Sequence, residues 1–266
     1  MTFRIIVCAK QVPDTNEIKI DPVTKTLVRE GVRSIMNHDD ANALEEALKI
    51  KDIYPDTHIT VLSMGPMQAK YMLRECLAMG ADAAVLASDR ALGGSDTWAT
   101  SNALAAAIGK LGEFDLIFAG RQAIDGDTAQ VGPQLAEKLG LPQVTYVTEF
   151  KIEGDMKSIT VKRALEDGYE IIRIKTPCVL TAIKELNMPR YMSIRGIYNA
   201  IRTEIPLWGA KELEIALNTV GLDASPTNVF RSFTPMPKGK GIMIKADTDR
   251  EAAQKLLIDL RAKHII

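Results

Sequence analysis

Apolar runs alternate with helical patterns through the first half of the chain, and this order restricts the fold more than any other feature. Short runs rich in Ile, Val and Ala predict strands, while apolar residues three and four positions apart predict helices. Such an alternation is typical of a parallel sheet covered by helices on both faces. Strands are expected at 3–9, 58–64, 83–87 and 115–119, and helices from about 39 and at 66–78, 96–110 and 128–139.

Two local features refine this pattern. In the first expected helix, Ala41, Leu44 and Leu48 share one face, and Glu45 stands four residues before Lys49. That spacing favours an ion pair on a helix surface. The preceding segment, 17–29, is predicted to be a β-hairpin that turns at Asp21-Pro22.

The pattern changes between Val144 and Ile183, where three or four strands follow one another without helices. Antiparallel hairpins are therefore expected to extend the sheet. The predicted fold class is α/β, with a Rossmann-like parallel sheet covered by helices, extended by antiparallel strands and followed by a C-terminal arm.

Prolines interrupt the arm after Asn187, and its apolar residues follow no helix or strand period. The prolines are Pro189, Pro206, Pro226, Pro235 and Pro237, and the apolar residues include Trp208, Leu213, Leu217 and Phe230. An arm lying on another subunit would bury them, and a local wrap over the chain's own sheet is the alternative. The chain ends in an expected amphipathic helix, with a capping box of Thr248 and Glu251 and an apolar stripe of Ala253, Leu256, Leu257 and Leu260.

Composition narrows the class of partner. The 266 residues are 46% hydrophobic and 25% charged, with a net charge of -1 and 5% aromatic residues. A balanced charge and few aromatics disfavour nucleic acid and anionic membranes as partners. Neither a membrane span nor a secretory segment is evident, so a cytoplasmic location is expected. Cys8, Cys76 and Cys178 are expected to be buried reduced thiols, and His38, His58 and His264 are too scattered for a zinc site.

The loop from Gly120 to Gly132 is the main candidate for a binding site. It follows the expected strand 115–119, so it lies at a carboxyl end, where ligands bind in such sheets. Asp127 in the N-cap position and Gln130 at the third helical position explain part of the loop as a capping box. Neither explains the length of the loop or Arg121, and free amides near Gly126 at a helix N-terminus suit a pyrophosphate.

The loop from Ser88 to Thr100 is the second candidate. It contains Gly93 and Gly94 and opens a helix at Ser95 or Asp96. A capped helix accounts for one acid, yet Arg90, Asp96, Thr97 and Thr100 supply more polar groups than a cap requires. No Gly-x-Gly-x-x-Gly follows the first strand, and no Gly-x-x-x-x-Gly-Lys-Ser/Thr is present, which disfavours an NAD-type Rossmann domain and a phosphate-loop ATPase.

The segment from Val161 to Thr181 has an order of residues that folding alone does not require. A basic pair, Lys162-Arg163, precedes three acids around Gly168, and a strand follows Pro177. Locally this predicts a hairpin with an Asp-Gly turn. The whole segment also resembles the signature of the electron transfer flavoprotein beta subunit, and the similarity extends over nearly the whole chain.

The resemblance implies where a nucleotide lies. Its adenosine would contact the end of the first strand, the turn before the first helix and the end of the next strand, and the Gly120–Gly132 loop would hold phosphates. The implied cofactor-binding residues are Cys8, Ala9, Lys10, Asn37, Asp39, Asp40, Ser63, Met64, Gly65, Gly120, Arg121, Gln122, Asp125, Gly126, Asp127, Thr128, Ala129, Gln130 and Val131, with Arg90, Asp96, Thr97 and Thr100 from the second loop.

Family members that hold AMP commonly have Asn before this Gln and a hydroxyl residue after it. Here Ala129 and Val131 stand in those places. Loops similar to 88–100 mark the electron-bifurcating branch of the family, in which the beta subunit carries FAD. FAD is therefore the expected cofactor, with AMP as the alternative and NAD(H) as substrate.

The implied function is that of the beta subunit of a bifurcating electron transfer flavoprotein, one part of an oxidoreductase complex without activity alone. Its FAD would accept a hydride from NADH, and the two electrons would be divided between ferredoxin or flavodoxin and an FAD on the alpha subunit. The alpha-subunit FAD would serve a partner dehydrogenase of acyl-CoA or lactate type. No catalytic residue or metal is expected in the chain, because the flavin carries the chemistry. The alternatives are a non-bifurcating beta subunit with structural AMP and a nucleotide-binding signalling module.

The resemblance also divides the chain. Residues 1–187 would form the nucleotide-binding domain, and 188–266 would supply a dehydrogenase-recognition loop, a subunit-binding arm and the terminal helix. The expected docking residues are Tyr191, Ile194 and Arg195, with Ile194 as the aliphatic anchor. The alternative places Ile194 in the core of an inter-domain turn.

Overall fold

The computed structural model describes residues 2–14, 33–154, 156–227, 229–230 and 239–266. Contacts divide the described chain into two units, one that contains the sheet and reaches Phe230, and one that contains the last helix. The hairpin expected at 17–29 and the prolines at 235 and 237 lie outside the described residues.

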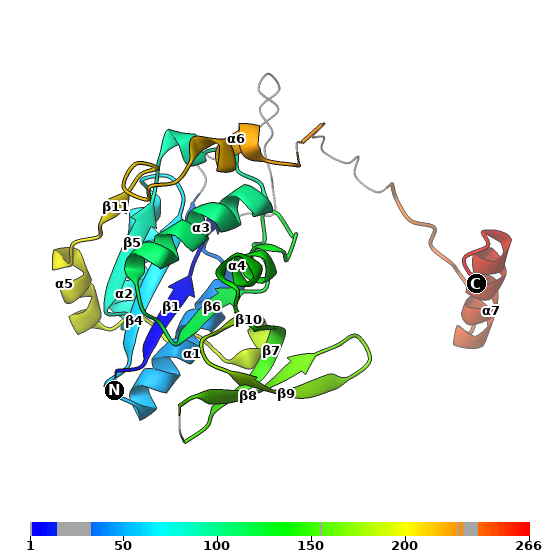
Figure 1. Ribbon diagram of the computed structural model, residues 1–266. Helices are drawn as coiled ribbons and strands as arrows, with labels where there is room; N and C mark the ends of the chain where they lie inside the picture. Colours follow the sequence, from blue (N-terminus) through cyan, green and yellow to red (C-terminus); the bar gives the residue numbers. More distant parts are fainter. Residues whose placement is uncertain (1, 15–32, 155, 228, 231–238) are drawn as a thin grey trace. The chain divides into compact units, whose positions relative to one another are not determined.

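A nine-stranded sheet forms the centre of the first unit, in the order β11-β5-β4-β1-β6-β10-β7-β8-β9 (Figure 1). Its middle is parallel because each of these strands is a buried apolar run joined to the next by a crossover. The strands of this middle are β1 (Arg4–Cys8), β4 (His58–Met64), β5 (Ala83–Ala87), β6 (Leu116–Gly120) and β10 (Cys178–Ala182). The strands expected at 58–64 and 83–87 have those bounds.

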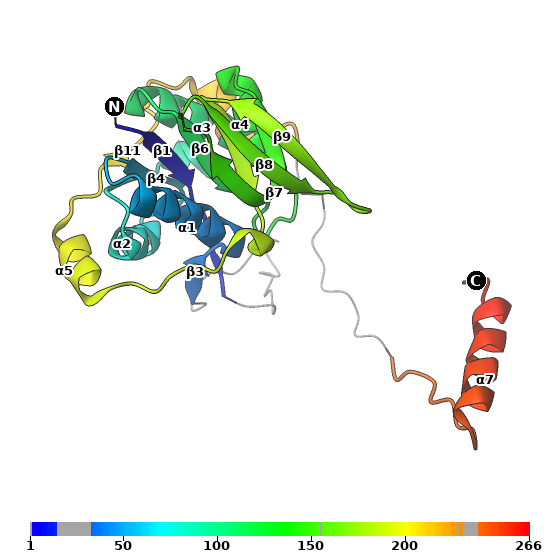
Figure 2. The same cartoon turned by 90° about the horizontal axis from the view of Figure 1, so that it is seen from below.

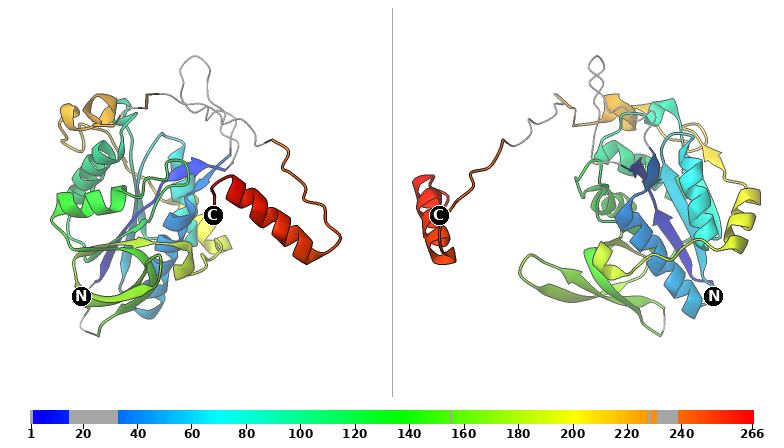
Figure 3. Two further views of the ribbon diagram at one scale, coloured as in Figure 1. Left: turned by 90° about the vertical axis from the view of Figure 1, so that its right-hand side faces the viewer. Right: turned by 180° about the vertical axis from the view of Figure 1, so that it is seen from behind.

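Helices cover both faces of the sheet, as the alternation predicts (Figure 2). Seen from behind, α1 (His38–Ile53) and α2 (Ala69–Met79) lie on one face (Figure 3). The other face carries α3 (Thr97–Leu111) and α4 (Val131–Leu139). Each face has its own apolar core, one around Leu44, Leu73 and Phe118 and one around Leu104, Ile117 and Leu135. The predicted α/β class is confirmed.

The antiparallel extension consists of β7 (Gln143–Ile152), β8 (Ser158–Ala164) and β9 (Tyr169–Lys175). The turn between β8 and β9 closes with a hydrogen bond from the Leu165 N–H to the Gly168 carbonyl, 2.9 Å long. This confirms the hairpin expected from the Asp-Gly turn. The fourth strand, β10, returns to the parallel part and pairs with β6 and β7. A separate pair is formed by β2 (Gln11–Pro13) and β3 (Ser34–Met36).

The segment after Asn187 packs partly on the chain's own sheet. Trp208 lies in β11 (Leu207–Trp208), which adds to the sheet beside β5, and Leu213 is buried. For these two residues, burial by another subunit was a wrong expectation and the local wrap is right. Leu217 and Phe230 are exposed. A short turn, η2 (Lys184–Leu186), precedes the segment. The segment itself also contains α5 (Ile194–Arg202), η3 (Leu217–Thr219) and α6 (Gly221–Ala224).

The second unit holds α7 (Asp249–Ala262). The Glu251 N–H donates to the Thr248 hydroxyl over 3.3 Å, so the Thr248 cap is confirmed. The Glu251 carboxylate accepts from the Asp247 N–H rather than the Thr248 N–H, so the capping box is incomplete. The stripe of Ala253, Leu256, Leu257 and Leu260 lies along this helix, and Leu256 and Leu257 are exposed. None of the helices in the described ranges is both long and apolar enough to cross a membrane.

Candidate nucleotide-binding site

The carboxyl ends of β1, β4 and β6 meet at one edge of the sheet, because the three strands are parallel neighbours (Figure 1). The residues that follow them are therefore brought together, as the sequence predicts. Cys8 and Ala9 are buried at this edge and Lys10 is exposed. Burial raises the pKa of the Cys8 thiol to about 12, so the thiol stays protonated and unreactive.

The first turn of α1 ties this edge together. The Asp40 carboxylate accepts one hydrogen bond from the Lys10 N–H and one from the Gly120 N–H, each 2.8 Å long. It thereby joins the ends of β1 and β6. Burial raises the pKa of Asp40 to about 7, although both amide hydrogen bonds lower it. A carboxylate occupied in this way supports the ends of the two strands.

Asn37 organises the loop after β6 in the same manner. Its side-chain Nδ2 donates to the Gln122 carbonyl over 2.8 Å, and its Oδ1 accepts from the Ile124 N–H over 3.1 Å. Asn37 is buried. The side chains of Asn37 and Asp40 therefore fix the path of the loop, and what they leave open to a ligand is the loop's backbone.

The two cations at the edge already have acidic partners. The Lys10 ammonium lies 2.7 Å from Asp125, and the Arg121 Nε lies 3.5 Å from Asp39. Arg121 also lies over the Tyr146 ring. Burial raises the pKa of Asp39, and Arg121 opposes that shift. A phosphate here would depend mainly on backbone N–H groups.

The loop's backbone is shaped to offer such groups. Asp127 and Ala129 adopt left-handed φ angles of 50° and 52°, and Gln130 follows in the right-handed region. Alternation of these two conformations turns successive N–H groups toward one side, which makes an anion-binding concavity. Among the described residues, no partner is found for the N–H groups of Thr128, Ala129 and Gln130. A Cβ on Gly126 would meet no atom within 4 Å, so space remains beside it.

The expected capping box is wrong. The helix α4 begins at Val131 rather than Thr128, because the left-handed residues delay its start, and Gln130 stands at the N-cap without a side-chain cap. Asp127 accepts a hydrogen bond from the Gln122 side chain instead, 2.8 Å long. The first N–H groups of α4 thus have no side-chain partner in the part of the chain that is described.

The second loop meets the first. Thr97 Oγ1 donates to Gln130 Oε1 over 2.9 Å, which joins the beginnings of α3 and α4. Asp96 caps α3 by accepting from the Ala99 N–H, as expected, and its other oxygen accepts from the Thr227 N–H. Although burial raises it, these bonds lower the pKa of Asp96 overall. Thr100 lies one turn further along α3, and Arg90 is exposed in η1 (Arg90–Leu92).

One buried hydroxyl at this edge has no partner. Ser63, at the end of β4, is 1% exposed, and its Oγ makes no hydrogen bond within the described ranges. Met64 and Gly65, which follow it, are partly exposed. An orphaned donor, free amides and open space at Gly126 fit a nucleotide with a phosphate chain.

The expected docking residues lie outside the core. Tyr191 is 97% exposed and Ile194 is 89% exposed, so the alternative that buries Ile194 is wrong. Ile194 begins α5, whose N-terminus Ser193 caps by accepting from the Gly196 N–H over 2.9 Å. Arg195 follows on the same helix and is exposed.

Comparisons with known proteins identify the family of the chain. The electron transfer flavoprotein domain model matches residues 24–213. A caffeyl-CoA reductase-Etf complex subunit, CarD, from Acetobacterium woodii is 60% identical and covers 99% of this chain and 100% of its own. The electron transfer flavoprotein subunit beta of Clostridium acetobutylicum is 55% identical with the same coverage. The acryloyl-CoA reductase electron transfer subunit gamma of Anaerotignum propionicum is 50% identical over 99% and 100%.

The chain belongs to the electron transfer flavoprotein beta-subunit family. Its cysteines are free and buried, as expected. Within the described ranges, His, Cys, Asp and Glu side chains form no cluster of three that could hold a metal.

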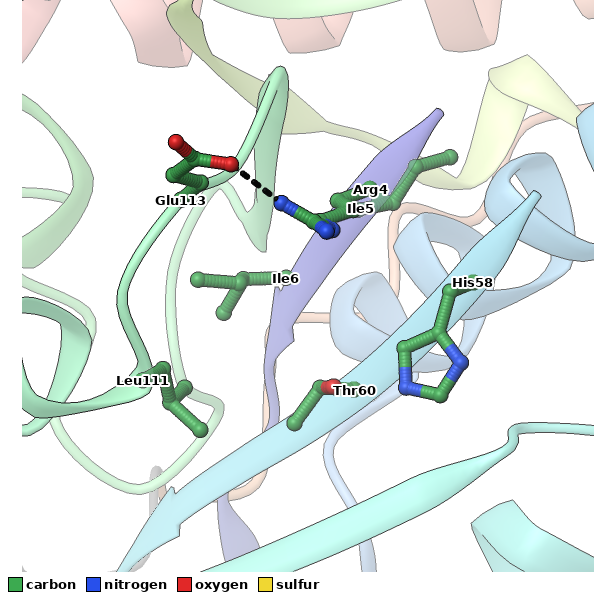
Figure 4. Close-up of a pocket in the computed structure, with 7 residues that line it drawn as sticks. All are labelled: Arg4, Ile5, Ile6, His58, Thr60, Leu111 and Glu113. Carbon is green, nitrogen blue, oxygen red and sulfur yellow. Dashed lines mark hydrogen bonds and ion pairs between the residues drawn. The ribbon is translucent and has the colours of Figure 1, made fainter. Parts of the chain in front are cut away.

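A cavity of about 440 Å³ lies at the opposite edge of this beta subunit's sheet (Figure 4). It is lined by Arg4, Ile5, Ile6, His58, Thr60, Leu111 and Glu113, and the Arg4 guanidinium donates to Glu113 across it. These residues lie around the amino ends of β1 and β4. Because ligands bind at the carboxyl ends of strands in such sheets, the cavity takes no part in the candidate site.

Sequence reasoning missed several residues of the beta subunit. The outer face of α5 also exposes Ile197, Tyr198 and Ile201. Their spacing from Ile194 is three, four and seven residues, and this period could have revealed the face. The tether of Asp96 to Thr227 gave no such signal, because it joins positions 131 residues apart.

Proposed function

We propose that this beta subunit binds FAD at the carboxyl edge of its sheet and works in an electron-bifurcating complex. The observation that carries the proposal is the Thr97–Gln130 hydrogen bond, which joins the Ser88–Thr100 and Gly120–Gly132 loops. A ligand held by the amides of one loop would also reach polar groups of the other. That extent suits FAD better than AMP, which ends at one phosphate.

The residues have different tasks in this proposal. The amides of Thr128, Ala129 and Gln130 and the N-terminus of α4 would hold the phosphates. Ser63 and the backbone after β1 would contact the adenosine, and Asp96, Thr97, Thr100 and Arg90 would face the remainder. Asn37, Asp39, Asp40 and Gln122 would act behind the ligand by fixing the loop, as would the Lys10–Asp125 and Arg121–Asp39 pairs.

FAD, when bound, supplies the redox chemistry, which is to accept a hydride from NADH and to pass one electron to ferredoxin or flavodoxin and one to an alpha-subunit FAD that serves a dehydrogenase. The chain's own part is to bind, orient and shield. Its acids at the site are engaged by amides or cations, and Cys8 stays protonated, so we assign proton transfer to none of them.

The partners follow from the surface and the relatives. We propose a heterodimer with an alpha subunit and docking of a flavin-dependent dehydrogenase through Tyr191, Ile194 and Arg195, at the start of the 188–266 region. Two relatives are named after caffeyl-CoA and acryloyl-CoA reductases, which favours an acyl-CoA type over a lactate type. We place the complex in the cytoplasm.

The purified heterodimer tests the cofactor. We expect an absorption spectrum and acid release to give two FAD molecules per heterodimer and no AMP. One flavin with one AMP would show the non-bifurcating type, and no flavin would show a signalling module. NADH should then bleach one of the two flavins without any dehydrogenase, and bleaching of neither would contradict the NADH role.

A further inference from the structure

Residues 188–193, which lead to the exposed Ile194, are called the docking segment here. The Arg190 side chain joins this segment to α1 through two carboxylates. Its Nε and Nη2 each lie 2.9 Å from a Glu45 oxygen, and Nη2 also lies 2.7 Å from Asp52. The Arg190 backbone N–H donates to the same Glu45 carboxylate over 2.9 Å. These bonds attach both the main chain and the side chain of Arg190 to α1. The hydrogen bonds to Glu45, and after them those to Asp52, raise the pKa of Arg190.

Glu45 depends on this contact. It is 5% exposed, and in the part of the chain described Arg190 is the one cation within ion-pair distance of it. The expected pairing of Glu45 with Lys49 is wrong, because Lys49 pairs with Glu46 at 3.0 Å. A buried carboxylate needs a paired charge, so Glu45 favours the conformation in which the docking segment lies on α1.

Asn187 provides a second attachment to α1. Its Nδ2 donates to the Asn42 carbonyl and to Glu46, both over 2.9 Å, and Asn42 Nδ2 donates back to the Asn187 carbonyl over 2.8 Å. The chain from 187 to 190 is thus fixed immediately before the exposed Tyr191.

The helix α5 is held separately, by α2. The Ser193 N–H donates to the Ala78 carbonyl over 3.4 Å, and a Cβ on Gly196 would collide with that carbonyl. At the other end of α5, Arg74 donates to the Ala200 carbonyl over 2.7 Å. Tyr191 and Met192 therefore span a gap between an attachment on α1 and one on α2.

From this arrangement we infer that Arg190 is a positioning residue for partner docking, which keeps 188–193 and the anchor Ile194 in one conformation before a dehydrogenase binds. The inference rests on the docking role proposed above. A segment ordered in advance loses less conformational freedom on binding, so affinity is higher without any added contact. Arg190 itself need not touch the partner.

Arg190→Lys tests the inference, because it keeps the charge but cannot form the bidentate fork. On the purified heterodimer, hydrogen exchange should become faster at 188–193 and stay unchanged at 197–202 and 120–132. Affinity for the caffeyl-CoA reductase of Acetobacterium woodii, used as the probe, should fall by about 2- to 10-fold, the range for ordering one side chain. Flavin content and reduction by NADH should not change.

Two further variants serve as a partial disruption and as a control. Asp52→Asn removes only the exposed half of the fork and should change exchange and affinity in the same direction, but less. Lys51→Gln removes another ion pair of α1, the one with Asp82, and within the described chain neither residue forms a hydrogen bond or ion pair with 188–193. It should behave like the wild type in both measurements.

The outcomes separate the inference from the proposed function. Unchanged exchange at 188–193 in Arg190→Lys would overturn the inference, and so would faster exchange over the whole subunit. Normal probe affinity in Arg190→Lys, with a loss in Ile194→Ala, would overturn it and leave the docking surface standing. Normal affinity in Ile194→Ala would remove the docking surface and the inference together.

Discussion

The carboxyl edge of the sheet and the outer face of α5 are both candidate binding regions, but they present opposite kinds of surface. At the edge, buried polar side chains such as Asn37 and Asp40 hold a backbone loop, and the loop offers amides. On α5, apolar side chains such as Ile194 are exposed to solvent, and polar contacts with α2 hold the helix on its other side. Polar groups therefore act as support in both regions, and only the presented surface differs.

One helix supports both regions. The first turn of α1 fixes the loop after β6 through Asp40, and its later turns hold the docking segment through Glu45. Changes to presented groups should thus alter binding with little effect on folding, while changes to supporting groups should alter both.

A pair of isoleucines gives the strongest contrast. Ile205 is 5% exposed and packs in the core, whereas Ile194 is exposed. Ile205→Ala should lower the free energy of unfolding by about 2–5 kcal/mol, as for other core truncations. Ile194→Ala should leave the melting temperature unchanged and weaken dehydrogenase binding by about 2 kcal/mol. Calorimetry and titration check both, and a lowered melting temperature in Ile194→Ala would break the comparison.

A pair of glycines makes the same test at the edge. A Cβ on Gly120 would come within 2.8 Å of the Asp39 Cβ and collide with Asp40, whereas one on Gly126 would meet nothing. Gly120→Ala should cost about 1–3 kcal/mol of stability through overpacking and should lower flavin content. Gly126→Ala should keep the melting temperature of the flavin-depleted heterodimer and weaken only FAD retention. Equal FAD retention in Gly126→Ala and the wild type would show that no ligand approaches there.

The sequence predicted the sheet and its site edge well because those depend on local pattern. The run at 83–87 is apolar throughout and the run at 58–64 is mostly apolar, and both strands have the expected bounds. The residues after β1, β4 and β6 meet because parallel strands end at one edge. That part of the site needed no tertiary information.

The errors occur where distant segments or backbone strain decide the structure. Glu45 pairs with Arg190, 145 residues away, and no helix period contains that partner. Leu213 is buried and Trp208 partly buried by the core of the sheet rather than by their own segment, so they show no local period. The start of α4 was misplaced because Asp127 and Ala129, neither of them glycine, adopt left-handed conformations.

The pH dependence of stability tests whether Asp40 is a buried support. Its pKa is raised from 3.8 to about 7, so between these values the folded state binds more protons than the unfolded state. The contribution of Asp40 to the free energy of unfolding is fully present below pH 3.8 and is lost as the pH rises through about 7. The slope is at most about 1.4 kcal/mol per pH unit. Unfolding of the flavin-depleted heterodimer from pH 4 to pH 8 should be less pH-dependent in Asp40→Asn, and parallel curves would contradict this.

Replacement of Ser63 should have the smallest effect, but the direction of the change in stability should differ between the FAD-free and FAD-bound states. Without a ligand its buried hydroxyl has no partner in the described chain, so Ser63→Ala should stabilise the flavin-depleted heterodimer by about 1 kcal/mol. With FAD bound, the variant lacks a hydrogen bond worth about 0.5–1.5 kcal/mol, so FAD affinity should fall. Melting curves with and without FAD would therefore shift in opposite directions. A loss of stability in both states would show that the hydroxyl supports the fold, and a gain in both would show that the ligand does not use it.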